Sequence, residues 1–176
     1  GLTFLRCRIA ISFACRNVMS EQKSNQLTSD LCLLVLRVAA GVLMIHHGLE
    51  KLQDPSGFTT FIVDQYFPFL PFDHILWTYL AAYTQIIGSV AIIFGIATRP
   101  AVIGLLSTMI FAMVFHFLDT GLQGAPFAVV DSHNYEFETS ALYFFIYLVI
   151  TIAGSGALSF SSLYKDRFPQ SIKAWV

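Results

Sequence analysis

The chain has 176 residues, of which 56% are hydrophobic and only 12% are charged, and its mean hydropathy is +0.67. A soluble domain carries about twice that share of charged residues. Ten Lys and Arg stand against eleven Asp and Glu, so the chain lacks the basic excess of a nucleic-acid-binding protein, and its three Cys provide no disulfide framework. The composition also excludes a disordered chain and points to a protein of the lipid bilayer.

The first 29 residues differ in composition from the rest of the chain. They contain Arg, Ser and small residues and no acidic residue before Glu21, which is typical of an organelle transit peptide. The alternative is a retained surface segment, because four apolar residues would share one face of a helix: Leu2, Leu5, Ile9 and Phe13. We expect an N-terminal basic segment, a membrane domain and a C-terminal tail, at residues 1–29, 30–163 and 164–176.

Long stretches with almost no charge define the expected membrane spans. Arg37 is the only charged residue in the first stretch, and Arg99 is the only one between His74 and Leu118. About 20 apolar residues cross a bilayer. The pattern predicts four spans, at Leu31–Leu49, His74–Ala97, Pro100–Leu118 and Glu136–Ala153. Proline suits the first turn of a helix, so Pro100 predicts a tight hairpin between the second and third spans.

A short aromatic stretch separates the first two spans. Residues 58–67 follow the turn sequence Asp54-Pro55-Ser56-Gly57 and precede Pro68. Aromatic side chains suit the headgroup layer of a membrane, so we interpret this stretch as a short interfacial helix.

The distribution of Lys and Arg predicts the orientation in the membrane. Eight of them lie in the N-terminal segment, the hairpin at Arg99 and the C-terminal tail, whereas only Lys51 lies in the other loops. Positive residues remain on the cytoplasmic or stromal side of a membrane. Both termini are therefore expected on that side.

Each span carries one stripe of small or polar residues at steps of three and four, and such stripes mark where membrane helices touch. In the second span the stripe contains Thr78, Ala81, Gln85, Gly88, Ile92 and Gly95. Four spans with one stripe each predict an all-α integral membrane protein, built as a four-helix up-down bundle with the short interfacial helix between spans one and two.

Four polar side chains within the spans form a candidate ligand pocket: Arg37, Gln85, Tyr143 and Tyr147. A charge inside the bilayer costs several kcal/mol and marks a functional site by default. Two roles are open for Arg37, namely structural pairing with Asp30, Tyr147 or free carbonyl groups, and the holding of an anionic or quinone-like ligand. For Gln85 the alternatives are a hydrogen bond across the helix seam and a ligand contact.

Ionisable residues gather at the expected outer ends of the spans. This outer polar cluster contains His47, Glu50, Lys51, His116, Asp119 and Glu136, with His133 and Glu138 nearby. A salt-bridged lid, a metal site and a proton-exchanging pocket are the alternatives. The lid is favoured and no metal is expected, because the chain has no fixed ligand spacing such as H-E-x-x-H.

In a photosynthetic membrane, three side chains could ligate a chlorophyll magnesium: His46, Gln85 and His116. No haem-attachment motif is present, and Cys7, Cys15 and Cys32 form no C-x-x-C pair, so neither haem binding nor thiol redox chemistry is expected.

Two runs of residues resemble a known family. The first contains Leu36-Arg37, Gly41, His47-Gly48-Leu49-Glu50-Lys51 and Gly57-Phe58, and the second contains Ala81 to Ser89, Gly95 and Thr98-Arg99-Pro100. Together with His116 and Tyr135-Glu136, they resemble the DoxX family of small four-span membrane proteins over residues 31–163, and look most similar to its cyanobacterial and algal forms. The family often has Glu where this chain has Gln85, which weakens an enzymatic role.

The resemblance implies a subunit associated with quinone-linked sulfur oxidation or with membrane oxidoreductases. No complete catalytic constellation can be assembled from the residues. We therefore expect a non-catalytic accessory subunit of a larger redox or photosynthetic membrane complex, with lipid and other membrane subunits as partners and chlorophyll, carotenoid or quinone as possible cofactors. The alternative is a quinone-binding component of a membrane oxidoreductase. A plastid thylakoid membrane is favoured over a bacterial-type inner membrane, and a transporter is disfavoured because no internal repeat is visible.

Overall fold

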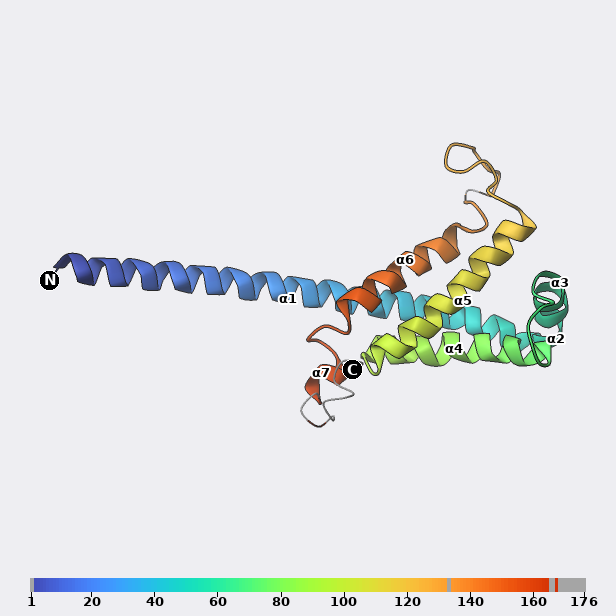
Figure 1. The fold of residues 1–176 in the computed structure, drawn as a ribbon, viewed down its shortest axis with the longest axis horizontal. Helices are drawn as coiled ribbons and strands as arrows, with labels where there is room; N and C mark the ends of the chain where they lie inside the picture. The colour runs from blue at the N-terminus through green and yellow to red at the C-terminus, as the bar shows by residue number, and fades with distance from the viewer. Residues whose placement is uncertain (1, 133, 165–166, 168–176) are drawn as a thin grey trace.

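The computed structural model describes residues 2–132, 134–164 and 167, and it describes side chains from Met19 onward. The described part of the chain is helical and contains no strand (Figure 1). Three helical stretches are long and apolar enough to cross a membrane, at Met19–Gln53, His74–Phe94 and Thr98–Asp119. The prediction of an all-α membrane protein is thus confirmed, and three of the four expected spans are found.

The first helix, α1 (Leu2–Gln53), runs without a break for 52 residues, or about 78 Å at the usual rise per residue. No Pro or Gly interrupts it between Leu2 and Ala40. In Figure 1 its N-terminal half extends far beyond all other helices. The expected span Leu31–Leu49 is therefore a segment in the C-terminal half of a much longer helix. The structure describes no side chains before Met19, so the helix face expected for Leu2, Leu5, Ile9 and Phe13 lies outside its described side chains.

A tight hairpin joins the next two helices, α4 (His74–Phe94) and α5 (Thr98–Asp119). The Asp73 carboxylate accepts a hydrogen bond from the backbone N–H of Ile75 (3.3 Å) and caps the start of α4. The helix ends three residues earlier than predicted because Gly95 adopts a left-handed conformation, with φ +68°. Pro100 lies in the first turn of α5, as predicted.

The stretch between α1 and α4 is helical, which confirms the short helix expected there. It consists of α2 (Pro55–Phe58), a π-helical turn η1 (Thr59–Val63) and α3 (Asp64–Tyr66). The Asp54 carboxylate accepts a hydrogen bond from the N–H of Gly57 (2.9 Å) and starts the first turn. We call the end of the molecule that carries α2 and α3 the outer end, and the end with the α4–α5 hairpin the inner end.

The last long helix, α6 (Glu138–Ala153), has 16 residues, which corresponds to about 24 Å. It starts two residues later than the span predicted from Glu136. At this length it is shorter than the hydrocarbon core of a typical bilayer, which is about 30 Å thick. The four-helix bundle is therefore not established by helix length alone.

The helices pack in the order α1 on α4, α4 on α5 and α5 on α6, with further contacts between α6 and α1. Glycines allow the closest approach, because a Cβ atom at Gly41 would lie 2.9 Å from the backbone oxygen of Ser89 and one at Gly48 would lie 2.8 Å from that of Ala82. The buried core between the helices contains Ala40, Met44, Ile92, Val102, Leu105, Met109, Tyr143, Tyr147 and Ile150.

The segment that follows α6 connects α1 to the end of α4 at the inner end of the molecule. Its backbone N–H groups at Ala157 and Ser161 donate to the Asp30 carboxylate (2.8 Å) and to the Gly95 carbonyl (3.1 Å). The fully buried Arg37 donates from Nη2 to the carbonyl of Leu158 (2.5 Å). Of the structural partners expected for Arg37, a free carbonyl is the one found. Pairing with Asp30 is not observed, because that carboxylate binds the backbone of the segment instead.

The glycine contact between α1 and α4 generates a first prediction. Replacing Gly41 by Val forces the α1 backbone away from Ser89 and is expected to lower the free energy of unfolding by about 1–3 kcal/mol. Ala39→Val is the control, because Ala39 is on the exposed face of the same helix. Unfolding in detergent, followed by circular dichroism, measures both. Equal stability of the two variants would contradict close packing at Gly41.

The inner end generates a second prediction. An alanine at Gly95 would combine the strain of a positive φ with a clash against the Arg37 guanidinium and Ser159. Gly121 also has a positive φ (+67°) but nothing lies within 4 Å of its added Cβ, so Gly121→Ala isolates the backbone effect. We expect Gly95→Ala to destabilise the protein by at least about 1 kcal/mol more than Gly121→Ala. The same unfolding measurement tests this prediction. A similar loss of unfolding free energy in the two variants would contradict a tight Arg37–Gly95 contact.

Candidate functional site

A cavity of about 500 Å³ lies in the outer half of the molecule. Residues of α1, α4, α5, α6 and the helical stretch between α1 and α4 all contribute to its wall. In Figure 1, α5 and α6 lean away from the α1–α4 pair toward the outer end. The helices that touch closely at the inner end therefore leave space farther out. A volume of this size is within the usual range of small-molecule sites.

The stretch between α1 and α4 covers the outer side of this cavity. Its side chains Phe58, Val63 and Phe67 line the wall. Phe67 packs edge-on against Phe111 of α5, with ring centroids 5.3 Å apart, and the Tyr66 hydroxyl donates to the Asp119 carboxylate at the end of α5 (2.5 Å). This hydrogen bond raises the pKa of Tyr66 above its ordinary value. The stretch thus bridges α4 and α5 where the helices diverge.

Most of the cavity wall is apolar, and a limited set of polar side chains interrupts it. These are His47, Lys51, Trp77, Thr84, Gln85, Ser107, Thr108, His116, Thr139, Ser140 and Tyr143. Among the described residues of the wall there is no Asp or Glu. The ionisable groups that face the cavity are therefore two imidazoles, one ammonium group and one phenol. Such a wall suits a ligand that is mainly apolar and carries oxygen atoms able to accept hydrogen bonds.

Gln85 is the most constrained polar residue of the wall. It lies on α4 with only 3% of its surface exposed. Its Oε1 atom is buried and has no hydrogen-bond partner in the described part of the chain. An acceptor left without a partner in a protein interior costs about 1–3 kcal/mol. A hydroxyl or N–H group of a bound molecule would remove this cost, so Gln85 is a candidate ligand contact.

An aromatic column joins the cavity to the core. The imidazole of His47 meets the ring of Tyr143 edge-on at a centroid distance of 6.0 Å, and Tyr143 stacks on Tyr147 at 5.9 Å. Tyr143 faces the cavity, whereas Tyr147 is fully buried below it. Lys51 is held at the outer side by a hydrogen bond to the His47 carbonyl (3.0 Å) and by the Phe58 ring, 4.9 Å from its Nζ.

The structure divides the ligand pocket that we predicted. Gln85 and Tyr143 line the cavity together, but Arg37 and Tyr147 do not belong to its wall. Both are fully buried, and Arg37 is held at the inner end by the segment after α6. The two pairs lie at different depths, because Arg37 reaches Gly95 and Leu158 at the inner end, whereas Gln85 and Tyr143 line the cavity farther out.

The outer polar cluster is also divided rather than joined into one lid. His47, Lys51 and His116 line the cavity. Asp119 binds Tyr66, and the backbone N–H of Glu136 donates to the side-chain oxygen of Gln123 (2.8 Å). Glu138 accepts from the N–H of Tyr135 (3.2 Å), and His133 lies outside the described residues. No pattern in the sequence indicates that part of this cluster and part of the predicted pocket share one cavity.

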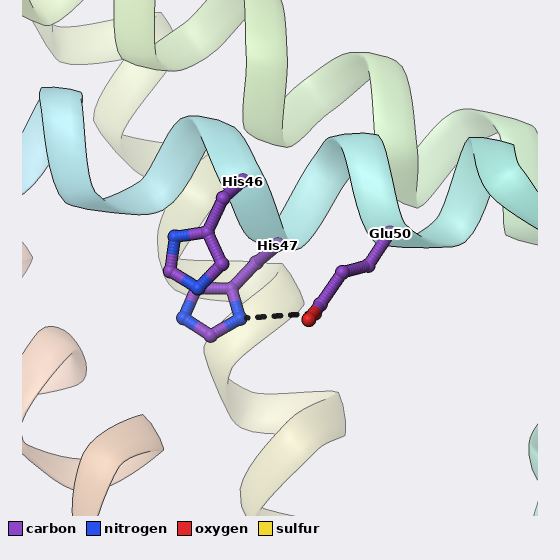
Figure 2. A group of neighbouring side chains, drawn as sticks. All are labelled: His46, His47 and Glu50. Carbon is purple, nitrogen blue, oxygen red and sulfur yellow. Dashed lines mark ion pairs between the residues drawn. The ribbon is translucent and has the colours of Figure 1, made fainter.

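His46, His47 and Glu50 lie together on α1 (Figure 2). One ligand atom from each side chain falls within 4.8 Å of the other two. The His47 Nδ1 atom is 3.6 Å from a Glu50 oxygen, and the two imidazole centroids are 3.9 Å apart. No metal is expected from the sequence because the chain has no fixed ligand spacing such as H-E-x-x-H. The spacing of four residues between His46 and Glu50 was the signal that could have indicated it.

The three residues expected as pigment ligands have different surroundings. His46 is exposed on α1, whereas Gln85 and His116 line the cavity. As a lone ligand, each would have to face lipid, and of the three His46 is exposed, His116 is half-buried and Gln85 is buried.

Comparison with known proteins gives one match. Residues 32–118 match the DoxX family model. The matched region begins in the membrane-spanning part of α1, includes all of α4 and ends near the end of α5, so it includes most of the cavity wall. No curated protein and no solved structure matches the chain. Through residues 32–118, the chain belongs to the DoxX family of membrane proteins.

Proposed function

We propose that this DoxX protein binds a lipid-soluble quinone or hydroquinone in the cavity between its helices. The observation that carries the proposal is the buried Gln85, whose Oε1 lacks a partner on the wall of a largely apolar cavity of about 500 Å³. A hydroquinone hydroxyl can donate to this oxygen. The resemblance to the DoxX family, which implies an association with quinone-linked oxidation, supports the same ligand class.

The rest of the wall suits a flat ring with two opposed oxygen atoms. The rings of Phe58, Phe67, Phe111 and Phe115 provide apolar surface for the ligand ring and its tail. Hydrogen-bond donors for a quinone oxygen are available from His47, His116 and Tyr143. Since the described wall has no carboxylate, the groups that could exchange a proton with a hydroquinone are the two imidazoles, the Lys51 ammonium group and the Tyr143 phenol. This supports a binding component more than a complete enzyme.

The membrane arrangement that goes with this proposal is a four-helix up-down bundle with α6 as its fourth span. The contacts of α6 with both α5 and α1 support it, and a short helix can be accommodated by local thinning of the bilayer. An even number of spans places both termini on one side, in agreement with the Lys and Arg distribution. We propose that this is the stromal or cytoplasmic side, in a plastid thylakoid membrane or, as the alternative, in a bacterial-type inner membrane.

Trp77 allows a direct test because it lies in the cavity wall. In lipid nanodiscs, a Trp175→Phe background leaves Trp77 as the only tryptophan, and titration with a short-chain quinone should quench its fluorescence in a saturable manner. Adding Gln85→Leu should weaken this binding at least about tenfold, which corresponds to one lost hydrogen bond of about 1.4 kcal/mol.

Ser89→Ala provides the matched control. Ser89 is on the same helix, is equally buried and also lacks a hydrogen-bond partner among the described residues, but it does not line the cavity. Its substitution should leave quinone binding unchanged. Quenching that is not saturable, or that is equal in the Gln85→Leu and Ser89→Ala proteins, would contradict the proposal.

A second candidate function is that of an accessory subunit in a larger membrane complex. It is favoured by the exposed stretch of α1 at residues 19–29, every one of which is exposed in this chain. An isolated helix with no tertiary packing is only marginally stable in water. A neighbouring subunit that packs against this stretch would stabilise it.

The mass of the particle in native membranes tests this second candidate. After extraction in mild detergent, a subunit of a complex should migrate well above the size of a single chain, and chlorophyll or carotenoid bands in that particle would identify a photosynthetic complex. A variant lacking residues 2–29 should leave the complex if the exposed helix holds it there. Migration of the intact chain as a colourless monomer would exclude this role while leaving the quinone site untouched.

A further inference from the structure

We propose that His46, His47 and Glu50 bind one divalent transition-metal cation, of the class represented by Zn²⁺, at the outer end of α1. The three side chains are placed side by side in Figure 2, and their candidate ligand atoms all lie within 4.8 Å of one another. This inference does not depend on the quinone proposal. It uses a different group of side chains, of which only His47 belongs to the cavity wall.

The orientation of the two histidines is the first argument. Consecutive residues of an α-helix point about 100° apart around the axis, so the side chains of neighbours usually diverge. Here the rings of His46 and His47 converge, with centroids 3.9 Å apart and planes inclined by 36°. Their nitrogen atoms are thereby brought to one side of α1, where both can face the same cation.

Glu50 completes the group from the next helical turn. It follows His47 by three positions and His46 by four, the two spacings that place helical side chains on one face. Its carboxylate oxygen is already 3.6 Å from the Nδ1 atom of His47. Tetrahedral coordination with metal–nitrogen distances near 2.0–2.1 Å needs ligand atoms about 3.3 Å apart. Because His46 is exposed and the Glu50 side chain is 66% exposed, small rotations close the remaining distance without disturbing the core.

The chemistry of the three ligands defines the class of cation. Two neutral imidazoles and one carboxylate suit Zn²⁺, Cu²⁺, Ni²⁺ or Co²⁺ better than Mg²⁺ or Ca²⁺, which prefer oxygen ligands. Lys51, the nearest cation on the chain, is engaged by the His47 carbonyl and the Phe58 ring. Three protein ligands leave at least one coordination position open. Since His47 also lines the cavity, that position is close to any molecule bound there.

Cobalt binding provides the test, because Co²⁺ in such a site gives visible absorption bands that Zn²⁺ abolishes on displacement. The full chain in nanodiscs should bind one Co²⁺ per protein, and Zn²⁺ should compete for it. The variants His46→Gln and Glu50→Gln should each weaken Co²⁺ binding at least about tenfold, in line with the loss of one of three ligands.

His74→Gln is the matched control. His74 also pairs with a carboxylate, at 2.6 Å from Asp64, but it is remote in sequence from the proposed ligands and no third candidate ligand is described beside it. Its substitution should leave cobalt binding unchanged, and unfolding in detergent, followed by circular dichroism, should show that all three variants are folded. Absence of stoichiometric Co²⁺ binding, or a Co²⁺ affinity in the His46→Gln and Glu50→Gln proteins equal to that of the unsubstituted chain, would overturn the metal site without affecting the quinone proposal.

Discussion

Gly41 and Gly48 allow the backbone of α1 to lie directly against that of α4, where any side chain at these positions would meet a carbonyl oxygen. Inside a bilayer the hydrophobic effect does not drive helices together, so this close van der Waals contact replaces it. The α1–α4 pair then forms the rigid frame of the molecule. Its inner end holds Arg37 against Gly95, and its outer half presents His47, Lys51 and Gln85 on one wall.

The positions of α5 and α6 relative to the α1–α4 pair determine where the cavity forms. At the inner end, Gly88 allows Leu105 of α5 to approach α4, with an added Cβ only 3.1 Å from the leucine side chain. Toward the outer end, α5 and α6 lean away from the α1–α4 pair, and the short helical stretch before α4 bridges the divergence through Tyr66 and Phe67. The cavity is a consequence of this geometry, because side chains of ordinary size cannot fill the widening space.

Polar groups are distributed unevenly between the two ends of the molecule. At the inner end Arg37 meets a backbone carbonyl and the segment that follows α6, in surroundings that leave its Nε and Nη1 atoms without partners among the described residues. At the outer end, Gln85 lines a cavity, and its buried Oε1 has no hydrogen-bond partner among the described residues. Of these two residues, only Gln85 lies beside the cavity in which we propose that a ligand binds. The buried arginine, which is the more conspicuous residue in the sequence, therefore contacts backbone at the inner end, whereas the less conspicuous glutamine is the ligand contact that we propose.

Hydropathy, turn residues and family motifs are local properties, and from them the sequence by itself determined the membrane class, the three long spans, the short helix between the first two and membership of the DoxX family. It also assigned Gln85 and Tyr143 to one candidate ligand pocket, together with Arg37 and Tyr147. Only the tertiary structure decided that these two residues share a cavity with His47 and His116 while Arg37 and Tyr147 do not. The physical reason is that helix tilt and divergence arise from the packing of all the helices, and no single segment of the chain encodes them.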